Sequence, residues 1–129
     1  MHTFKKSERL CSQKLITELF SKGKSFYINP FKVVWHSTEL AVGTPSQLLI
    51  SVSKRNFKKA VDRNKVKRLI RESFRKNKAP LYEYCKLHEK QCIFMISYNT
   101  KIILPYSEIE NKIKVILQRL VLEYEKSSK

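Results

Sequence analysis

The amino-acid sequence predicts an α+β fold, an α/β sandwich in which helices pack on one open β-sheet. Amphipathic segments with helical spacing alternate with short runs of β-branched and aromatic residues, in the order αββαβα. A chain of 129 residues with 42% hydrophobic side chains can bury a single two-layer core. We therefore expect one domain over residues 1–129, with a frayed tail at 126–129 and a mostly antiparallel sheet of about four strands.

The first helix is expected at about residues 13–22. Ser12 can cap its N-terminus, because a serine oxygen accepts hydrogen bonds from the free backbone N–H groups there. Gly23 supplies a stop at the other end. The apolar side chains recur at the spacing of one helical face: Leu15, Ile16, Leu19 and Phe20.

Three runs of residues predict strands. Residues 31–36 and 47–53 are separated by a loop that contains Gly43 and Pro45, and we expect them to pair as a hairpin. Residues 92–98 form a nearly continuous apolar run, which is typical of a central strand buried on both faces. The strand–helix–strand unit from 47 to 98 could add a parallel pair, for which a right-handed crossover is the general rule.

Two longer helices complete the prediction. One should run from about residue 57 to residue 77 and end before Pro80. The other should begin near Ser107, after Pro105, and continue to about Glu125. Its apolar residues share one face: Ile109, Ile113, Ile116, Leu117, Leu120 and Tyr124.

The net charge of the chain is +16, and most of it lies in one segment. Residues 54–78 hold twelve Lys and Arg residues against two acidic ones, Asp62 and Glu72. Such an excess implies a polyanionic partner, because self-repulsion otherwise opposes the compact state. Nucleic acid and an anionic membrane both meet this requirement.

The helix within this segment is amphipathic. At ~100° per residue, Val66 and Leu69 fall on an apolar side, opposite an arc that contains basic residues and Asn64. Arg grips phosphate with a planar fork of donors, and Asn can both donate and accept at a base or sugar edge. We therefore favour RNA as the partner. The alternatives are a solvated, salt-bridged helix face and a helix that binds a membrane surface or a partner protein.

The remaining features predict no catalytic or metal site on the protein. Cys85, His88 and Cys92 have a superficial zinc spacing, with Cys11 or His2 as a further ligand, but a buried inert cysteine is the simpler reading of Cys92. The glutamates Glu108 and Glu110 suit a helix N-terminus better than acid–base chemistry. Three cysteines, with no signal peptide visible and no apolar run long enough to cross a bilayer, predict a cytoplasmic protein with free thiols and no membrane role.

Residues 51–75 resemble the signature of the ribonuclease P protein family, with the core Arg63-Asn64-Lys65-Val66-Lys67-Arg68. The resemblance extends to Phe4-Lys5-Lys6, Arg9-Leu10, Leu19-Phe20 and Gly23 at the N-terminal end. It implies a noncatalytic protein that binds the catalytic RNA of ribonuclease P and the 5′ leader of precursor tRNA, as a monomer in a 1:1 complex. The RNA would hold the Mg²⁺ ions that perform the cleavage, and the crossover between parallel strands would be left-handed.

The resemblance, together with the charge of the segment, gives two sets of expected site residues. The catalytic RNA would contact Lys54, Arg55, Lys58, Lys59, Arg63, Asn64, Lys65, Lys67, Arg68, Arg71 and Arg75. The leader would lie in a cleft beside the first helix, lined by Ile16, Phe20, Phe31, Lys32, Val34 and His36. A ribosomal-type RNA-binding protein that only stabilises folded RNA is the alternative function.

The chain departs from the family pattern at three positions. Lys65 stands where Arg is usual and loses the bidentate fork. Lys58 stands near a place where many members have Gly, and Ile16 replaces a common aromatic residue in the first helix.

The aromatic residues near the cleft leave one question open. If Phe31, Val33 and Trp35 point into the core, Lys32, Val34 and His36 line the cleft, and the reverse arrangement is equally compatible with the sequence. Phe20, Phe31 and Trp35 are candidates for stacking on single-stranded bases.

Overall fold

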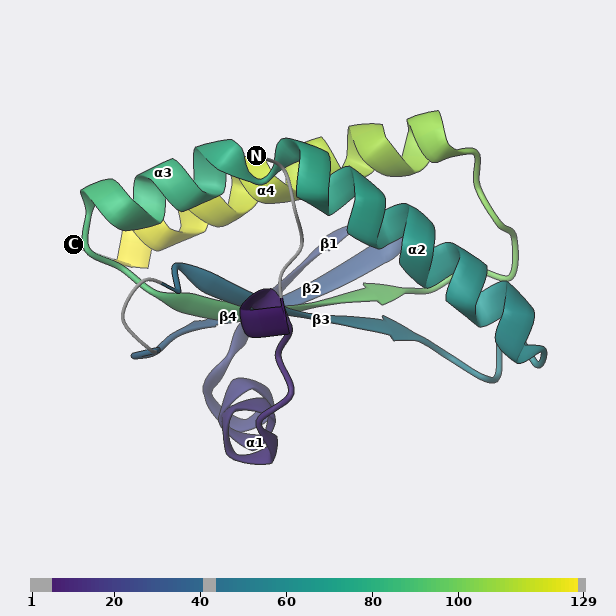
Figure 1. Ribbon diagram of the computed structural model, residues 1–129, viewed down its shortest axis with the longest axis horizontal. Helices are drawn as coiled ribbons and strands as arrows, with labels where there is room; N and C mark the ends of the chain where they lie inside the picture. The colour runs from purple at the N-terminus through teal and green to yellow at the C-terminus, as the bar shows by residue number, and fades with distance from the viewer. Residues whose placement is uncertain (1–5, 41–43, 128–129) are drawn as a thin grey trace.

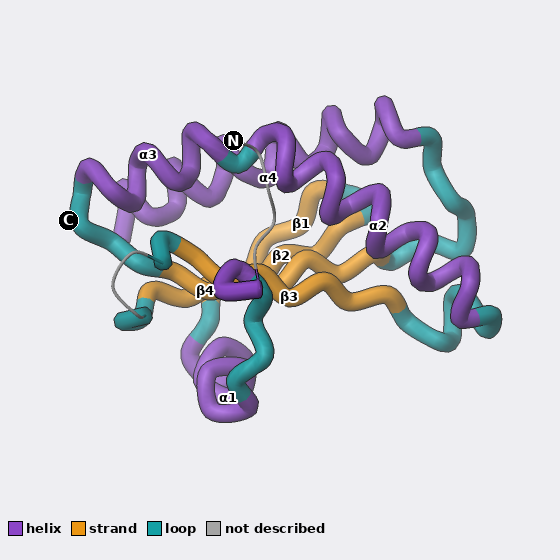
Figure 2. Tube along the Cα trace, in the orientation of Figure 1, coloured by secondary structure: helices purple, strands orange, loops and turns teal. Residues whose placement is uncertain are grey.

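A four-stranded β-sheet separates a small helix on one face from three helices on the other (Figures 1 and 2). The computed structural model describes residues 6–40 and 44–127. Its helices are the 3₁₀ turn η1 (Lys6–Glu8), α1 (Gln13–Lys22), α2 (Ala60–Asn77), α3 (Ala79–Leu87) and α4 (Tyr106–Ser127). Its strands are β1 (Lys24–Ile28), β2 (Phe31–Ser37), β3 (Ser46–Val52) and β4 (Cys92–Tyr98).

The strand order is β1-β2-β4-β3, and it confirms the predicted fold class. β1 pairs antiparallel with β2, β2 antiparallel with β4, and β3 parallel with β4. The predicted hairpin between 31–36 and 47–53 is wrong, because β4 lies between those two strands. The hairpin partner of β2 is β1, a strand of five residues that the sequence analysis does not predict.

The connection between the parallel strands is left-handed, as the family resemblance implies. In Figure 1 the chain leaves β3, returns above the sheet through α2 and α3, and enters β4 behind β3. α2 packs over β3, and α4 packs over β1 and β2. This places α2 along the β3 edge of the sheet, where one of its sides remains open to a partner.

The helix boundaries differ from the prediction at three places. Phe57 is buried but precedes α2, which begins at Ala60. Pro80 lies in the first turn of a further helix, α3, which begins at Ala79; a proline there costs no helical hydrogen bond. α4 includes Lys126 and Ser127, so the predicted frayed tail is wrong for these two residues, while 128–129 lie outside the described residues.

Two hydrophobic clusters lie on opposite faces of the sheet. The larger one joins the sheet to α2, α3 and α4 and contains Phe31, Val33 and Trp35 of β2. The smaller one lies between the sheet and α1 and contains Val34 of β2 and Leu19 of α1. Phe31, Val33 and Trp35 therefore point into the main core, which is the first of the two arrangements that the sequence left open for β2.

Gly23 ends α1 where the helix meets β2. A Cβ atom at this position would lie 2.2 Å from the Leu19 carbonyl oxygen and 2.8 Å from Val34 Cγ1. The φ of Gly23 is −70°, so close approach rather than a left-handed conformation requires the glycine.

Gly23→Ala should therefore destabilise the protein by about 1–3 kcal/mol, the range for overpacking against well-packed neighbours. Urea unfolding measures this change, and Ser25→Ala, on the exposed side of β1, serves as the control. A loss below about 0.5 kcal/mol would mean that α1 can move away from the sheet at little cost.

Candidate RNA interface

The segment predicted to bind RNA comprises α2 and the loop before it. α2 buries Val66, Ile70 and Phe74 completely. The predicted RNA-binding residues lie around the remaining sides of the helix and in the loop. We call this set the basic surface: Lys54, Arg55, Lys58, Lys59, Arg63, Asn64, Lys65, Lys67, Arg68, Arg71 and Arg75.

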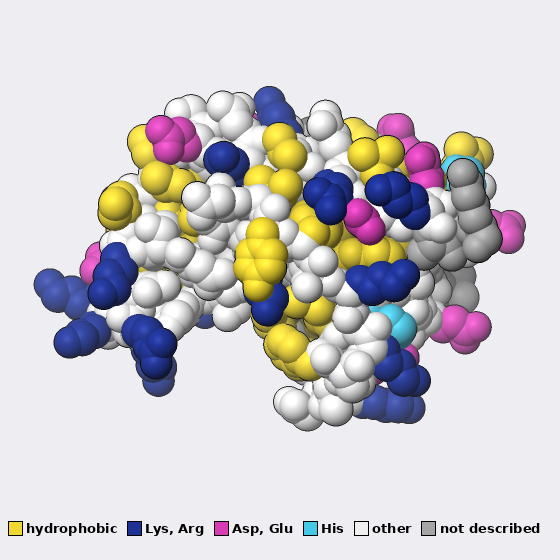
Figure 3. Space-filling view, turned by 180° about the vertical axis from the view of Figure 1, so that it is seen from behind, with side chains coloured by type: hydrophobic (Ala, Val, Ile, Leu, Met, Phe, Trp, Pro, Cys, Tyr) yellow, Lys and Arg dark blue, Asp and Glu magenta, His cyan; other side chains and the backbone are white. Residues whose placement is uncertain are grey.

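Most of the basic surface is open to solvent. The exposed members are Lys54, Arg55, Lys58, Lys59, Asn64, Lys65 and Arg68. Seen from behind, Lys and Arg side chains gather at the lower left of Figure 3, the end of the molecule where β3 leads into α2. Three properties therefore coincide at one end of the fold: positive charge, exposure and a rigid helical support. These are the properties that contact with a phosphate backbone requires.

Two of the predicted arginines are engaged within the protein. Arg63 donates from Nη1 to the carbonyl oxygens of Phe57 (2.8 Å) and Lys58 (3.0 Å), so it holds the loop against the start of α2. Arg75 forms an ion pair with Glu72 one turn earlier on α2. The hydrogen bond from Arg75 lowers the pKa of Glu72, so this carboxylate stays ionised at neutral pH. Both arginines are half-buried, so fewer of their N–H donors are available to RNA than those of the exposed Arg68.

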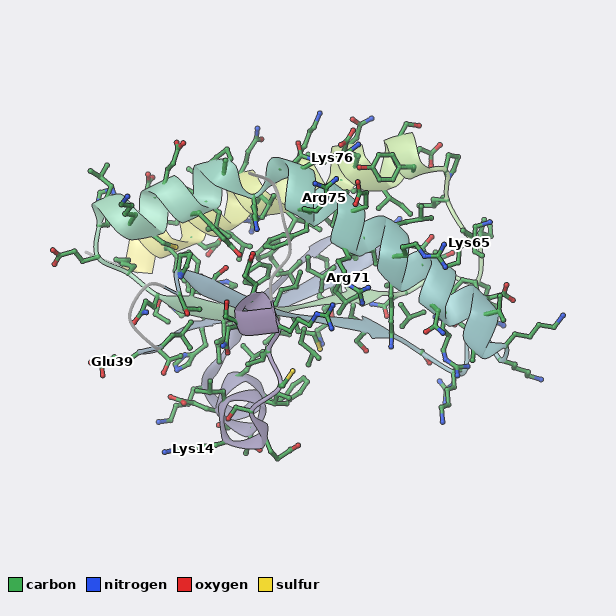
Figure 4. All side chains as sticks on the ribbon, in the orientation of Figure 1. Lys14, Glu39, Lys65, Arg71, Arg75 and Lys76 are labelled. Carbon is green, nitrogen blue, oxygen red and sulfur yellow. The ribbon has the colours of Figure 1, made fainter. Side chains whose placement is uncertain are left out.

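Arg71 occupies the side of α2 that faces the sheet edge, and Figure 4 shows its side chain directed from the helix towards the sheet. It is half-buried, and its Nε atom has no hydrogen-bond partner in the part of the chain that the structure describes. Burial lowers the pKa of Arg71, and the nearby charges of Arg9 and Arg68 lower it further. A positive potential is thus concentrated at this edge.

The second predicted site lies on the face of the sheet that α1 covers in part. Lys32 and His36 are half-buried there, and Val34 is buried beneath α1. His36 Nε2 lies 3.2 Å from Glu18 Oε1, which joins β2 to α1. Ile16 packs against the small cluster, while the ring of Phe20 remains 58% exposed. Five of the six predicted leader residues therefore lie on α1 or on this face.

Phe31 is a correction to the predicted leader site. It is fully buried in the main core, where its ring packs edge-on against Tyr98 at 5.3 Å between centroids. Trp35, the other stacking candidate on β2, packs against Tyr124 of α4 at 4.5 Å. Neither ring can stack on a base, because both point to the opposite face of the sheet.

The sequence reading missed Tyr27, which is 66% exposed on β1. It is the direct cross-strand partner of Lys32, and Lys32 Nζ lies 5.7 Å from the centre of its ring. Tyr27 thus adds an aromatic platform beside a cation on the face that also carries Val34. The sequence signal was the run Phe26-Tyr27-Ile28, in a segment for which the sequence analysis predicts no element.

The residues with zinc-like spacing do not assemble into a metal site. Cys85 and Cys92 are buried with their sulfur atoms 4.0 Å apart, but His88 is exposed and its ring lies against Tyr84. Cys11 is exposed, and His2 lies outside the described residues. Within 6–40 and 44–127, no three His, Cys, Asp or Glu side chains come together as a metal ion would require.

The two glutamates of α4 have structural positions. Glu108 lies in the first turn, where a carboxylate stabilises the helix dipole. Glu110 accepts hydrogen bonds from Asn77 at the end of α2 (3.1 Å) and from Tyr106 (3.2 Å). The Asn77 hydrogen bond is the main cause that lowers the pKa of Glu110, so the carboxylate joins α2 to α4 in its ionised form.

No helix in the described part of the chain is both long enough and apolar enough to span a membrane.

The chain is similar to known proteins over most of its length. The family model described as Ribonuclease P matches residues 4–121. A ribonuclease P protein component from Porphyromonas gingivalis is 40% identical over 93 residues, which make up 72% of this chain and 66% of that protein, just under two thirds of its length. One from Petrotoga mobilis is 34% identical over 121 residues and covers 92% of this chain and 95% of that protein.

Solved structures extend the likeness to the fold. The RNase P protein from Thermotoga maritima superposes with a TM-score of 0.67 at 26% identity, covering 87% of this chain and 96% of that one. A mutant RNase P protein from Staphylococcus aureus, described as defective in mRNA degradation, gives the same score at 25% identity and covers 89% of each chain. The family model spans nearly the whole chain, including the basic surface and α1, and on this ground the chain belongs to the ribonuclease P protein family.

Proposed function

We propose that this chain is the protein subunit of ribonuclease P, which matures the 5′ end of precursor tRNA. The observation that carries the proposal is the basic surface, whose exposed side chains lie on one rigid helix and the adjoining loop. Its density of Lys and Arg suits the backbone of a large folded RNA, for which contacts to phosphate dominate affinity. The protein would act in the cytoplasm, as a monomer in a 1:1 complex with the RNA.

The chemistry would belong to the RNA. Mg²⁺ supplies Lewis-acid activation of water and stabilises charge at the scissile phosphate. Ligands for this ion would come mainly from RNA phosphates, and this chain would contribute positive charge that lets the RNA fold and bind substrate at lower Mg²⁺. In this proposal no residue of the protein takes part in bond breaking.

The 5′ leader would contact the sheet face beside α1. Phe20 and Tyr27 are the aromatic side chains exposed there, and Lys32 provides a cation beside Tyr27. Single strands bind where bases can stack on aromatic rings next to positive charge. Val34 and His36, with Ile16 from α1, would form the less exposed part of the same surface.

Reconstitution tests the proposed function. The protein is added to the ribonuclease P RNA of its own organism, and cleavage of precursor tRNA is followed while Mg²⁺ is titrated. We expect the protein to lower the Mg²⁺ required and to show no cleavage by itself. If the RNA gains no activity although it binds the protein, the chain is a structural RNA-binding protein of the ribosomal type. Cleavage by the protein alone would contradict the proposal directly.

The leader surface makes a separate prediction. Phe20→Ala and Tyr27→Ala should each weaken binding of precursor tRNA to the holoenzyme by about five- to one-hundredfold, as expected for the loss of one stacked base. Binding of mature tRNA, which lacks a leader, is the internal control and should not change. Leu87→Ala, at an exposed apolar position on α3, is the control variant. Equal losses for both tRNAs would place the leader elsewhere.

A further inference from the structure

The N-terminal segment that follows η1 runs along the open edge of β3. Arg9 forms a parallel bridge with Leu48, and Leu10 N donates to the Leu48 carbonyl oxygen at 3.0 Å. Leu10 is buried in the small cluster beneath α1, whereas the side chain of Arg9 is exposed. The segment therefore extends the sheet at the edge over which α2 packs.

A buried ion pair fixes this segment to the helix layer. Glu8 Oε2 accepts hydrogen bonds from Lys78 Nζ at 2.6 Å and from Tyr82 Oη at 2.5 Å. Lys78 lies at the junction of α2 and α3, and both it and Glu8 are buried. Burial and the Glu8 carboxylate raise the pKa of Tyr82, so the phenol remains a donor to Glu8 at neutral pH. Lys78 thus differs from the exposed members of the basic surface, because its charge is paired with a buried carboxylate inside the protein.

Arg9, which follows Glu8 in the sequence, lies near two other positively charged arginines. Arg9 comes close enough to Arg71 to affect its ionisation, and Arg68 does so from one helical turn away on α2. Arg71 Nε is buried and makes no hydrogen bond to any residue within 6–40 and 44–127. Arg9 and Arg68 each disfavour the charged form of Arg71, and the buried Nε donor of Arg71 adds to the unfavourable free energy. An anion between them would offset both effects.

We propose that Arg9, Arg68 and Arg71 form one binding site for the phosphate backbone of RNA, and that Glu8 acts through Lys78 and Tyr82 to position Arg9 in it. The inference rests on the proposed function and extends the RNA interface beyond the basic surface to the N-terminal segment. Arginine suits this site because its fork of N–H donors grips phosphate oxygens in pairs. The RNA that occupies the site is the catalytic RNA, which already contacts Arg68 and Arg71 in the proposed complex.

Arg9→Ala tests the site itself. Affinity for the ribonuclease P RNA is measured across a series of salt concentrations, with Lys126→Ala as a control that removes one exposed charge from the far end of α4. We expect the log–log salt slope of Arg9→Ala to fall by about 0.7–0.9 and its affinity at low salt to fall about tenfold. A slope equal to that of the control would overturn the site.

Tyr82→Phe tests the positioning role without leaving a buried charge unpaired. It removes one hydrogen bond to Glu8 and keeps the aromatic ring that packs on Phe74. In the wild-type background we expect a partial loss of RNA affinity and of salt slope. In the Arg9→Ala background we expect no further loss of either, although thermal stability falls equally in both. An equal loss of affinity in the two backgrounds, or none in either, would show that the anchor only stabilises the fold.

A variant with alanine at Lys65, Lys67 and Arg68 separates this inference from the function on which it rests. If that variant loses RNA affinity while Arg9→Ala binds fully, the RNA interface stands and only the site at the β3 edge is refuted. If both variants bind like the wild type, the proposed RNA interface fails as a whole.

Discussion

Replacing Lys65, Lys67 and Arg68 together with alanine should reduce the slope of log affinity for RNA against log salt by about 2 to 3, since each lost phosphate contact removes ~0.7–0.9. At low salt the affinity should fall by a hundredfold or more, as an order of magnitude estimate from three charge-assisted contacts. All three residues lie on α2 with at least partly exposed side chains. The fold should survive, because none of them belongs to either hydrophobic cluster.

The matched control removes the same charge from another surface. Lys112, Lys114 and Lys126 are exposed on α4, and none of them belongs to the basic surface. Their replacement with alanine lowers the net charge by the same amount, so a general effect of charge would change both variants equally. We expect the α4 variant to keep at least two thirds of the wild-type slope. Similar losses in both would mean that RNA responds to total charge and not to the basic surface.

Phe74→Ala should lower the free energy of unfolding by about 3–5 kcal/mol, a large part of the 5–15 kcal/mol expected for a domain of this size. Phe74 is fully buried between α2 and the sheet. The centroid of its ring lies 5.8 Å from the ring centroid of Phe94 on β4 and 6.1 Å from that of Tyr82 on α3. Removing it would leave a cavity where these three elements meet, and rigid neighbours could not close it.

Urea denaturation followed by circular dichroism measures this loss, with Val61→Ala as the control. Val61 is on the same helix but 77% exposed, and its truncation should change stability by less than about 0.5 kcal/mol. RNA binding by the folded fraction of Phe74→Ala should keep the wild-type salt slope, because the cationic side chains are unchanged. A stability loss below 1.5 kcal/mol, which is smaller than the core range, would show that the core can repack around the missing ring.

Much of the fold was predictable from local patterns. The bounds of α1 match the expected 13–22, because a serine cap and an apolar face of regular spacing are local signals. β4 matches the expected 92–98, since a continuous apolar run is typical of a strand covered on both faces. The hairpin assignment failed because strand pairing is a long-range property. Nothing in 31–36 or 47–53 reveals that the strand at 92–98 lies between them.

The candidate site, too, was predictable from sequence only where it depends on local patterns. The composition of α2 indicated its cationic side and its apolar side, and Val66 and Ile70 are buried as expected. The roles of Arg63 and Arg75 within the protein depend on atoms of the loop and of Glu72, which a helical projection does not position. Similarly, Phe31 could not be assigned to a face from sequence, because a strand with apolar residues on both sides fits either orientation.

The sequence by itself determined that this chain carries a dense cationic helix, that the helix belongs to an α+β domain, and that the family signature lies on it. Charge, periodicity and motif are properties of neighbouring residues, so they can be read without coordinates. Only the tertiary structure brought Arg9 to Arg71 across 62 positions of sequence and buried Glu8 against Lys78. Such contacts depend on how the sheet edge and the helix layer pack together, and packing is decided by the whole chain rather than by any segment of it.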